Sequence, residues 1–348
     1  MKSPISFFAG CDYFRLTKRP EIIRAVRGGL EKYGLNVAAS RVTTGDHVLY
    51  RELENALARF FAAPAALLVS NGYASNSVVA QTLRGAFSHV VIDAKAHVSL
   101  RDASRFFDCP ILEFRSRDPA DFRRVLAGAG GSIKPILLTD GVFTDDGEIA
   151  PLAEYLKILG PHGVILLDDA HGAGVIGRTG RGTLEYAGVS RGRIIQSVTL
   201  SKAFGVYGGA VLCSRALRGN MFVRSAMFAG STPLPLPLAY AALRAVKFLR
   251  KDRSLLRRLN QNVQYVKTAL RAAGIAVSLT PVPVIPIIPE NPTQAGVIKR
   301  RLIAHGVFPS FVKYPGGPAG GYFRFVISSE HSKRQLDDLL AALTGRSA

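Results

Sequence analysis

Short apolar runs alternate with longer amphipathic stretches along most of this sequence, and glycine-rich turns separate them. Short, largely apolar runs occur at residues 65–69, 89–93, 135–139, 164–167 and 208–213. The run at residues 164–167 is typical of a parallel strand that is buried on both faces. Helical periodicity lies between the strands and is clearest at residues 20–34 and 51–61. The pattern therefore predicts an α/β fold with a mostly parallel central sheet and helices on both faces.

The last third of the chain predicts a smaller α/β domain. Its expected strands lie at residues 276–279, 284–288, 308–312 and 322–327, and its expected helices at 293–305 and 332–344. Asn291, Pro292 and Gly306 suit the cap, the first turn and the end of the first of these helices. A long helical region at residues 238–273 links this domain to the preceding one. We expect an N-terminal segment at residues 1–20, a large domain at 21–237, and a linker helix with the small domain at 238–348.

Net charge is high for an α/β protein. The 348 residues include 45 lysines and arginines against 25 aspartates and glutamates, which gives +20. Such a charge can indicate nucleic-acid binding, but the cations are spread out and no zinc-finger or RNA-recognition motif accompanies them. We therefore expect no nucleic-acid partner. The charge either steers an anionic substrate or forms a solvated basic surface without a function.

Neither a membrane span nor a disulfide framework is expected. No apolar run approaches the ~18 residues of a membrane helix, and the start of the chain lacks the pattern of a signal peptide. Cys11, Cys109 and Cys213 are scattered without the spacing of a metal site. Such cysteines are typical of a reducing compartment. We therefore expect a cytoplasmic protein without a bound metal.

Residues 196–209 carry the most distinctive chemistry. An apolar, β-branched run leads through Thr199 and Ser201 to Lys202, and a glycine-rich turn follows. A lysine held in apolar surroundings has a lowered pKa and attacks carbonyl groups. A Schiff-base lysine for pyridoxal 5'-phosphate (PLP) needs this property. Taken alone, the stretch also fits a surface lysine in a loop.

A second stretch, residues 164–182, favours the chemical interpretation. Its apolar strand ends at Asp168, and His171 follows three residues later. Ligands of open α/β sheets bind at the carboxyl ends of the strands, where a carboxylate can pair with the protonated pyridine nitrogen of PLP. His171 can reach the phenolic oxygen of the ring or orient the aspartate. For this pair alone, a solvated turn after a core strand is the alternative.

Together the stretches DDAHGAGVIGRTGRG and TLSKAFGVYGG resemble the α-oxoamine synthases, a branch of the fold-type-I PLP enzymes. Similar segments follow in order from about residue 5 to residue 343, so the resemblance covers nearly the whole chain. The family includes 8-amino-7-oxononanoate synthase, glycine C-acetyltransferase, 5-aminolevulinate synthase and serine palmitoyltransferase. The resemblance implies a fold-type-I PLP-dependent transferase fold with a smaller C-terminal α/β domain.

The resemblance also implies which residues surround PLP. The glycine turn at residues 70–76 precedes a helix, whose N–H groups and dipole suit the PLP phosphate. His97 matches a histidine that stacks on the PLP ring in the family. The expected cofactor-binding residues are Asn71, Gly72, Tyr73, His97, Thr144, Asp168, His171, Thr199, Ser201, Lys202 and Thr232, and the expected catalytic residues are Lys202, His97 and Asp168.

Two further matches concern the substrate and the assembly. Arg324 matches an arginine of the family, and its forked guanidinium suits the carboxylate of an amino-acid substrate. A surface ion pair is the alternative for an arginine at a strand edge. Thr232 matches a threonine that reaches the PLP phosphate of the neighbouring subunit. The resemblance therefore implies a homodimer with shared active sites.

The chain also departs from the family pattern at several positions. Cys11 stands where the family has an asparagine near the amino-acid substrate, Arg15 where it has a glycine, and Tyr50 where it has a histidine. The N-terminal arm that relatives place near the acyl donor is expected to be missing. These departures put the identity of the substrate in doubt.

The resemblance implies condensation of an amino acid with an acyl thioester, with loss of CO2, to give an α-amino ketone. The acyl donor would be an acyl-CoA or an acyl carrier protein, and the reaction would be like that of 8-amino-7-oxononanoate synthase. The site residues by themselves predict only that Lys202 removes the Cα proton of the substrate. The acyl transfer is implied by the resemblance alone. Transamination or other PLP-dependent chemistry at Cα is one alternative. A non-catalytic ligand-binding protein is another, although the presence of Lys202, Asp168 and His171 counts against it.

Overall fold

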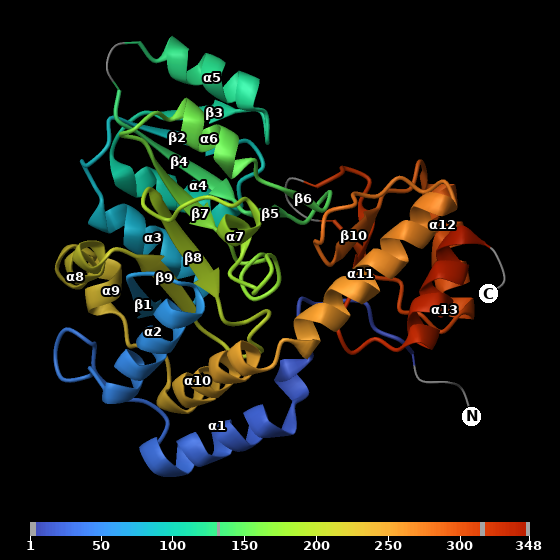
Figure 1. Cartoon of the computed structure of the whole chain (residues 1–348), viewed down its shortest axis with the longest axis horizontal. Helices are drawn as coiled ribbons and strands as arrows, with labels where there is room; N and C mark the ends of the chain where they lie inside the picture. Colours follow the sequence, from blue (N-terminus) through green and yellow to red (C-terminus); the bar gives the residue numbers. More distant parts are fainter. Residues whose placement is uncertain (1–4, 131–132, 314–316, 346–348) are drawn as a thin grey trace. The chain divides into compact units, whose positions relative to one another are not determined.

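The computed structural model describes residues 5–130, 133–313 and 317–345. The chain divides into two compact units (Figure 1). Unit 1 comprises Met1–Arg15, Phe143–Ile149 and Arg253–Ala348, and unit 2 comprises Leu16–Val142 and Ala150–Asp252. The domain boundaries expected at residues 20 and 237 stay a prediction, because compactness does not test which parts fold as domains.

Unit 2 is built on a seven-stranded sheet in the order β1-β9-β8-β7-β4-β2-β3. Neighbouring strands are parallel except at β9, which runs antiparallel to both β1 and β8. The strands are β1 (Ala65–Val69), β2 (His89–Asp93), β3 (Ile111–Phe114), β4 (Pro135–Asp140), β7 (Val164–Asp168), β8 (Ile194–Thr199) and β9 (Gly209–Cys213). The mostly parallel sheet is the one that the apolar runs predict.

The helices of unit 2 pack on this sheet or on one another (Figure 1). They are α1 (Pro20–Tyr33), α2 (Val48–Phe60), α3 (Gly72–Thr82), α4 (Val98–Ser104), α5 (Pro119–Gly128), α6 (Leu152–Ile158), α7 (Thr183–Tyr186), α8 (Arg215–Arg224), α9 (Ala226–Gly230) and α10 (Leu236–Lys251), with 3-10 turns η1 (Leu16–Lys18) and η2 (Arg105–Phe107). Leu67, Ile136 and Leu166 of the strands pack with Val79 of α3 in a core without solvent exposure. This packing holds the amino end of α3 beside β8 and β9.

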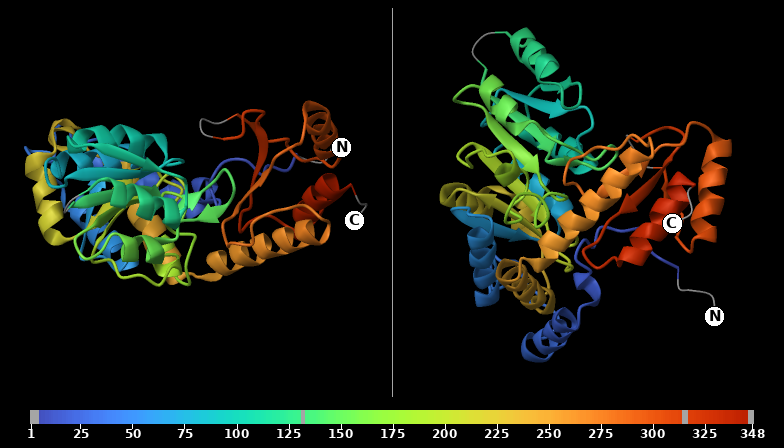
Figure 2. Two further views of the ribbon diagram at one scale, coloured as in Figure 1. Left: turned by 90° about the horizontal axis from the view of Figure 1, so that it is seen from above. Right: turned by 45° about the vertical axis from the view of Figure 1, so that its right-hand side comes forward.

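Unit 1 has a three-stranded antiparallel sheet in the order β10-β12-β11. Its elements are α11 (Ser254–Ala272), β10 (Val284–Ile287), α12 (Pro292–Ala304), β11 (Phe311–Val312), β12 (Tyr322–Val326) and α13 (Lys333–Thr344). Figure 2 shows the orange-to-red helices of this unit beside its strands. A short hairpin, β5 (Val142–Phe143) with β6 (Glu148–Ile149), lies where the chain passes between units. No described helix has the length and apolar character that crossing a bilayer needs.

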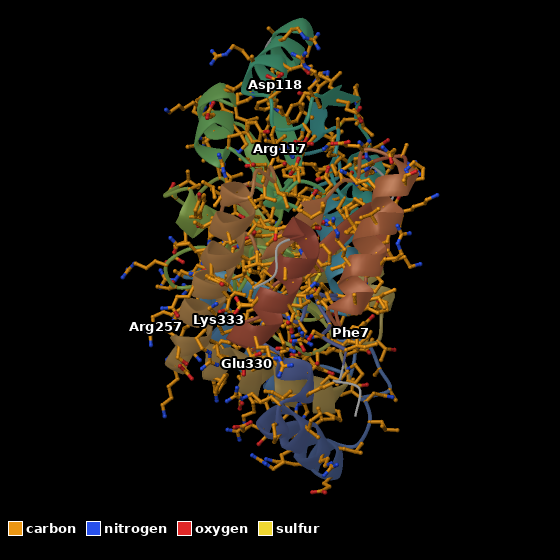
Figure 3. The ribbon with its side chains drawn as sticks, turned by 90° about the vertical axis from the view of Figure 1, so that its right-hand side faces the viewer. Phe7, Arg117, Asp118, Arg257, Glu330 and Lys333 are labelled. Atoms are coloured by element: carbon orange, nitrogen blue, oxygen red, sulfur yellow. The ribbon has the colours of Figure 1, made fainter. Side chains whose placement is uncertain are left out.

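The N-terminal segment belongs to unit 1 through backbone pairing. Ser6 bridges to Val307, and the N–H of Val326 donates to the carbonyl of Phe8 at 2.7 Å. The neighbouring Phe7 ring stacks on Phe308 (4.8 Å between centroids). Figure 3 labels Phe7 and, on the same unit, Glu330, which pairs with Arg258 at 2.5 Å.

Three sequence expectations differ from the structure. The strand expected at residues 276–279 is wrong, because the Ser278 hydroxyl accepts the N–H of Thr280 (3.2 Å) and offers the backbone a local turn instead. The helical region 238–273 is two helices, since Asp252 adopts an extended conformation and ends α10. The sequence pattern also missed β3, whose residues are mostly accessible and lack an unbroken apolar signal.

Candidate active site

Lys202 lies just beyond the carboxyl end of β8. This strand is buried along its whole length between β7 and β9, and the chain leaves it at Thr199. A tight turn follows, in which the N–H of Leu200 donates to the carbonyl of Gly208 (2.9 Å). The turn leaves Lys202 half-buried, with its Nζ 2.7 Å from Nε2 of His171. The predicted lysine and histidine therefore lie within hydrogen-bonding distance of each other.

Asp168 ends β7, the strand next to β8, and its carboxylate is held from several sides. Nδ2 of Asn76 donates to Oδ2 of Asp168 at 2.8 Å, and the hydroxyl of Ser99 donates to the same oxygen at 3.3 Å. The N–H of Ala170 donates to Oδ1 at 3.1 Å. The Asn76 amide is itself oriented by the Ser197 hydroxyl, which donates to its Oδ1 at 2.6 Å. The carboxylate is only 7% exposed, so these bonds determine its orientation.

His97 connects to Asp168 through one hydroxyl. Its Nδ1 lies 2.8 Å from the Ser99 hydroxyl and accepts the Ser99 N–H at the start of α4. The backbone N–H of His97 donates to Oδ2 of Asp140 at 2.7 Å. Burial lowers the pKa of His97; the nearby Asp168 carboxylate opposes this shift and the Lys202 amine adds to it. The imidazole is therefore favoured in its neutral form.

Two carboxylates beside these groups have raised pKa values. Burial raises the pKa of Asp140 well above its usual range, and the negative charge of Asp168 adds to the effect. Burial also raises the pKa of Asp169 to about 6, against the opposing hydrogen bonds from Thr183 and Gln196. Asp169 accepts three hydrogen bonds, from the N–H and hydroxyl of Thr183 and from Nε2 of Gln196 (2.9, 2.6 and 2.6 Å). Its role is to hold the loop after β7.

The predicted glycine turn caps α3 and packs directly against β8. Asn71 is the N-cap, and its Oδ1 accepts the N–H of Ala74 at 2.9 Å. A Cβ on Gly72 would lie 2.8 Å from Cβ of Thr199, and one on Gly209 would lie 2.4 Å from the Asn71 carbonyl. Both positions therefore require glycine. The close approach puts the N-terminal N–H groups of an 11-residue helix next to the strand that leads to Lys202.

The remaining expected residues of unit 2 lie around this arrangement in different ways. The N–H of Ser201 donates to the Thr199 hydroxyl (3.2 Å), and Ser201 itself is exposed. Tyr73 is 45% exposed, and its hydroxyl donates to Asp102. The centroids of the Tyr73 and His97 rings lie 6.1 Å apart in a T-shaped arrangement. Thr232 is exposed, at a cavity of about 20 Å³ that Ser70 and Ala74 also line.

A family model named aminotransferase class I and II matches residues 16–343. The chain belongs to this family. Membership agrees with the sequence resemblance, and it confirms the expectation of a transferase enzyme with a fold-type-I architecture.

Individual members of the family resemble the chain along nearly its full length. The 8-amino-7-oxononanoate synthase of Symbiobacterium thermophilum is 33% identical over 334 residues, which are 95% of this chain and 85% of that protein. A solved structure of SPT with PLP superposes with a TM-score of 0.90 at 26% identity, covering 98% of this chain and 87% of the other. The serine palmitoyltransferase of Sphingomonas wittichii gives a TM-score of 0.88 at 25% identity, with coverages of 98% and 86%.

The two remaining expected residues, Thr144 and Arg324, belong to unit 1. Thr144 is half-buried in the turn between β5 and β6. Arg324 lies on β12, where its Nη2 donates to Sγ of Cys11 at 3.5 Å. Its Nε is buried and has no hydrogen-bond partner among the residues that the structure describes. Buried donors in folded proteins usually have a hydrogen-bond partner, which is a protein group, a water molecule or a ligand.

Sequence reasoning missed the residues that orient Asp168. Asn76, Ser99 and Ser197 were not among the expected site residues, although Asn76 ends the motif that begins at the glycine turn. The motif is the sequence feature from which Asn76 could have been predicted. No sequence feature indicates Ser99 or Ser197, because their function follows from contacts with residues that are distant in sequence.

The structure accounts for two departures from the family pattern. The hydroxyl of the fully buried Tyr50 donates to the carbonyl of Leu234 at 2.7 Å, so it anchors the chain before α10. Arg15 keeps a left-handed conformation (φ 53°), which explains a glycine in relatives. Its guanidinium donates to the Phe7 carbonyl at 2.8 Å. Both side chains therefore donate hydrogen bonds to backbone carbonyls of this chain.

Proposed function

We propose that this protein is a PLP-dependent acyltransferase that condenses an amino acid with an acyl thioester, with decarboxylation, to an α-amino ketone. The proposed reaction is like that of 8-amino-7-oxononanoate synthase, the name of a relative that matches 95% of the chain. The observation that carries the proposal is the arrangement at the ends of β7 and β8. There the Lys202 amine meets His171, and the neighbouring Asp168 carboxylate is oriented by Asn76.

The residues present fit PLP. The amino end of α3 suits a phosphate group, because its first N–H groups lack partners within the helix and its dipole favours an anion. Gly72 and Gly209 keep that helix end free of side chains where it packs on β8. The hydroxyls of Thr199 and Ser201 lie on the segment that leads to Lys202. We propose that these groups and Asn71 hold the phosphate.

Each remaining residue has a distinct role in the proposal. When bound, PLP supplies an electron sink for the electron pair at Cα of the substrate. Lys202 would hold the aldehyde carbon through Nζ until the amino group of the substrate replaces it there. The freed Lys202 amine would then remove the Cα proton, with His171 positioned to exchange a proton with it. Asp168 would keep the pyridine nitrogen protonated, and His97 would lie on the ring.

Arg324 is the residue that we assign to the carboxylate of the substrate. The buried, unpartnered Nε of Arg324 supports a role in binding the substrate carboxylate. Cys11 lies beside the same guanidinium, where the family has an asparagine. A thiol is a weaker hydrogen-bond partner than an amide, so we propose that Cys11 alters the choice of amino acid. We assign Thr144 to the cofactor.

The assembly and the location are also proposals. We propose a homodimer in which Thr232 reaches the phosphate of the neighbouring site, because the matching threonine does so in the family. The three cysteines are free in the structure, which supports a reducing, cytoplasmic location. The candidate acyl donors are an acyl-CoA and an acyl carrier protein.

Thiol release from a panel of acyl-CoA thioesters with glycine, alanine or serine tests the reaction. We expect release that needs both the amino acid and PLP, and that is lost in Lys202→Ala. Borohydride reduction followed by tryptic mapping should place the fixed cofactor on Lys202. Formation of a keto acid and pyridoxamine phosphate without thiol release would instead identify an aminotransferase.

A further inference from the structure

A groove between α1 and α10 lies outside the residues assigned above. Its volume is about 470 Å³, which is within the roughly 300–1,000 Å³ of small-molecule sites. The charged residues that line it are Arg19, Arg24, Arg244, Lys247 and Lys251, with Glu21 as the single carboxylate. The lining therefore carries five cations against one anion. No residue of the proposed PLP site contributes to it.

The packing of two antiparallel helices produces this groove. A Cβ on Gly29 would lie 2.9 Å from Cα of Pro237, so the backbones touch at that end. At the other end the Arg19 guanidinium lies 4.2 Å from the centre of the Phe248 ring. Gly28 faces open space and leaves the floor without a side chain. Figure 1 shows α1 and α10 side by side.

Most cations of the groove have no counter-charge among the residues that the structure describes. Arg244, Lys247 and Lys251 recur at intervals of three and four residues, so they share one face of α10, a helix that contains no aspartate or glutamate. Glu21 already pairs with Arg19 at 3.3 Å. Arg24, Lys247 and Lys251 have no ion-pair partner among the described residues. Like charges at this spacing destabilise a helix, and a bound anion would remove that cost.

The segment just before α1 packs against the turn that carries Lys202. Gly205 is three residues after Lys202, and its N–H donates to the Lys202 carbonyl at 3.0 Å. A Cβ on Gly205 would lie 2.5 Å from Cβ of Leu16 and 2.8 Å from the N of Thr17. Arg19, which lines the groove, is two residues beyond Thr17. The chain segment that enters the groove at Arg19 therefore packs directly on the turn that carries Lys202.

We propose that the α1–α10 groove binds the nucleotide end of a coenzyme A thioester, with its phosphates on Arg24, Arg244, Lys247 and Lys251. This assignment rests on the proposed acyl transfer. Coenzyme A carries a diphosphate and a 3′-phosphate, which match several separate cations, whereas a carrier protein presents a single phosphate. A second copy of this chain would bring the same positive groove against itself and be repelled.

Calorimetric titration of the PLP-loaded protein with coenzyme A tests the site. We expect the double variant Arg244→Glu/Lys247→Glu to weaken coenzyme A binding by about tenfold or more, the effect of roughly two exposed ion pairs. The control Lys299→Glu/Arg300→Glu makes the same charge change on exposed residues of α12 and should bind as the wild type does. Pantetheine lacks the phosphates and should show no difference between the three proteins.

Equal affinity of the groove variant and the wild type would overturn the proposal, and so would an equal loss in both double variants. A loss of binding confined to an acidic acyl carrier protein would also overturn it. Turnover of a neutral acyl-N-acetylcysteamine thioester separates the two proposals. If the wild type releases no thiol from any thioester, acyl transfer fails, while the binding result still reports on the groove.

Discussion

Two adjacent aspartates at the end of β7 illustrate how residue chemistry depends on surroundings. Asp168 receives an amide and a hydroxyl from Asn76 and Ser99. Asp169 has no exposure and is enclosed by donors from Thr183 and Gln196. The sequence letters are identical, yet the first carboxylate is oriented for a ligand and the second closes a loop.

The pair offers a matched test. Asp168→Asn should slow solvent deuterium exchange at Cα of a bound amino acid by orders of magnitude, at roughly 1.4 kcal/mol of barrier for each tenfold loss. Its effect on stability should be smaller than that of Asp169→Asn, which replaces an acceptor by a donor facing other donors and should cost about 1–3 kcal/mol. Exchange at the wild-type rate in Asp168→Asn would refute its assigned role.

His331 is a buried histidine in unit 1, and its lowered pKa predicts how the stability of the protein depends on pH. Its Nδ1 accepts the N–H of Ser328 (3.0 Å), and its Nε2 lies 2.9 Å from the Phe7 carbonyl, with the ring stacked on Phe8. Burial lowers the pKa of His331 to about 4, and the nearby Arg15 charge adds to the effect while the bond to Phe7 opposes it. The folded protein therefore keeps this ring neutral where the unfolded chain would bind a proton.

This difference in proton binding determines how the free energy of unfolding changes with pH. Between the ordinary histidine pKa near 6.5 and the folded value of about 4, the unfolded state binds more protons, so the free energy of unfolding falls as the pH falls. The contribution is fully present above about pH 6.5, and about 3 kcal/mol is lost by pH 4. Denaturant titrations should show this loss in the wild type and not in His331→Gln.

The control for this experiment is His305→Gln, because His305 is exposed at the end of α12. Its pH dependence should follow the wild type. Comparison between variants is needed, since the raised pKa of Asp169 acts in the opposite direction over part of the range. Parallel curves for the wild type and His331→Gln would contradict the assignment.

At the scale of elements, the site depends on the contact between the amino end of α3 and the end of β8. The strand supplies Thr199, and the helix supplies Gly72, which has no room for a side chain. The mid-helix N–H groups of α3 bond within the helix, so only its first turn is free to serve a ligand. The position of that first turn is therefore the property that these two elements determine together.

Gly72→Ala should destabilise the protein by about 1–3 kcal/mol through overpacking against Thr199 and should weaken PLP retention. Gly219→Ala is the matched control, because Gly219 lies inside α8 and a Cβ added there would have nothing within 4 Å. Alanine at this position should be stabilising by about 0.5–1 kcal/mol. Thermal unfolding and cofactor dissociation measure both effects. Equal behaviour of the two variants would argue against the close contact at Gly72.

At the scale of the whole molecule, the proposal of shared sites depends on Thr232. This residue is exposed, and in its own chain it lies at a small cavity with Ser70 and Ala74. The cavity is large enough for about one water molecule, so the chain by itself gives Thr232 no ligand-sized site. A neighbouring subunit would give its hydroxyl a function.

Mixing two inactive variants, Lys202→Ala and Thr232→Arg, tests the shared site. Mixed dimers should regain one working site, which combines an intact Lys202 from one chain with an intact Thr232 from the other. Activity should appear only after subunit exchange, which labelled protein can verify. No recovery after verified exchange would place Thr232 in the site of its own chain or outside the site.

The apolar runs and glycine turns of the sequence determined most of the strands, the parallel sheet and the positions of Lys202 and Asp168 at strand ends. These features depend on neighbours within a few residues, so periodicity and turn chemistry are enough to predict them. The wrong strand at residues 276–279 shows the limit of this local information, because one serine hydroxyl there competes with strand pairing.

Only the tertiary structure decided which polar residues orient Asp168 and which glycines are obligatory. Asn76 is 92 positions from Asp168, and Ser197 is 121 positions from Asn76. The groove between α1 and α10 likewise joins helices that are far apart in sequence. The free energy of such contacts depends on distance and burial in the folded chain, and no local pattern of residues records either quantity.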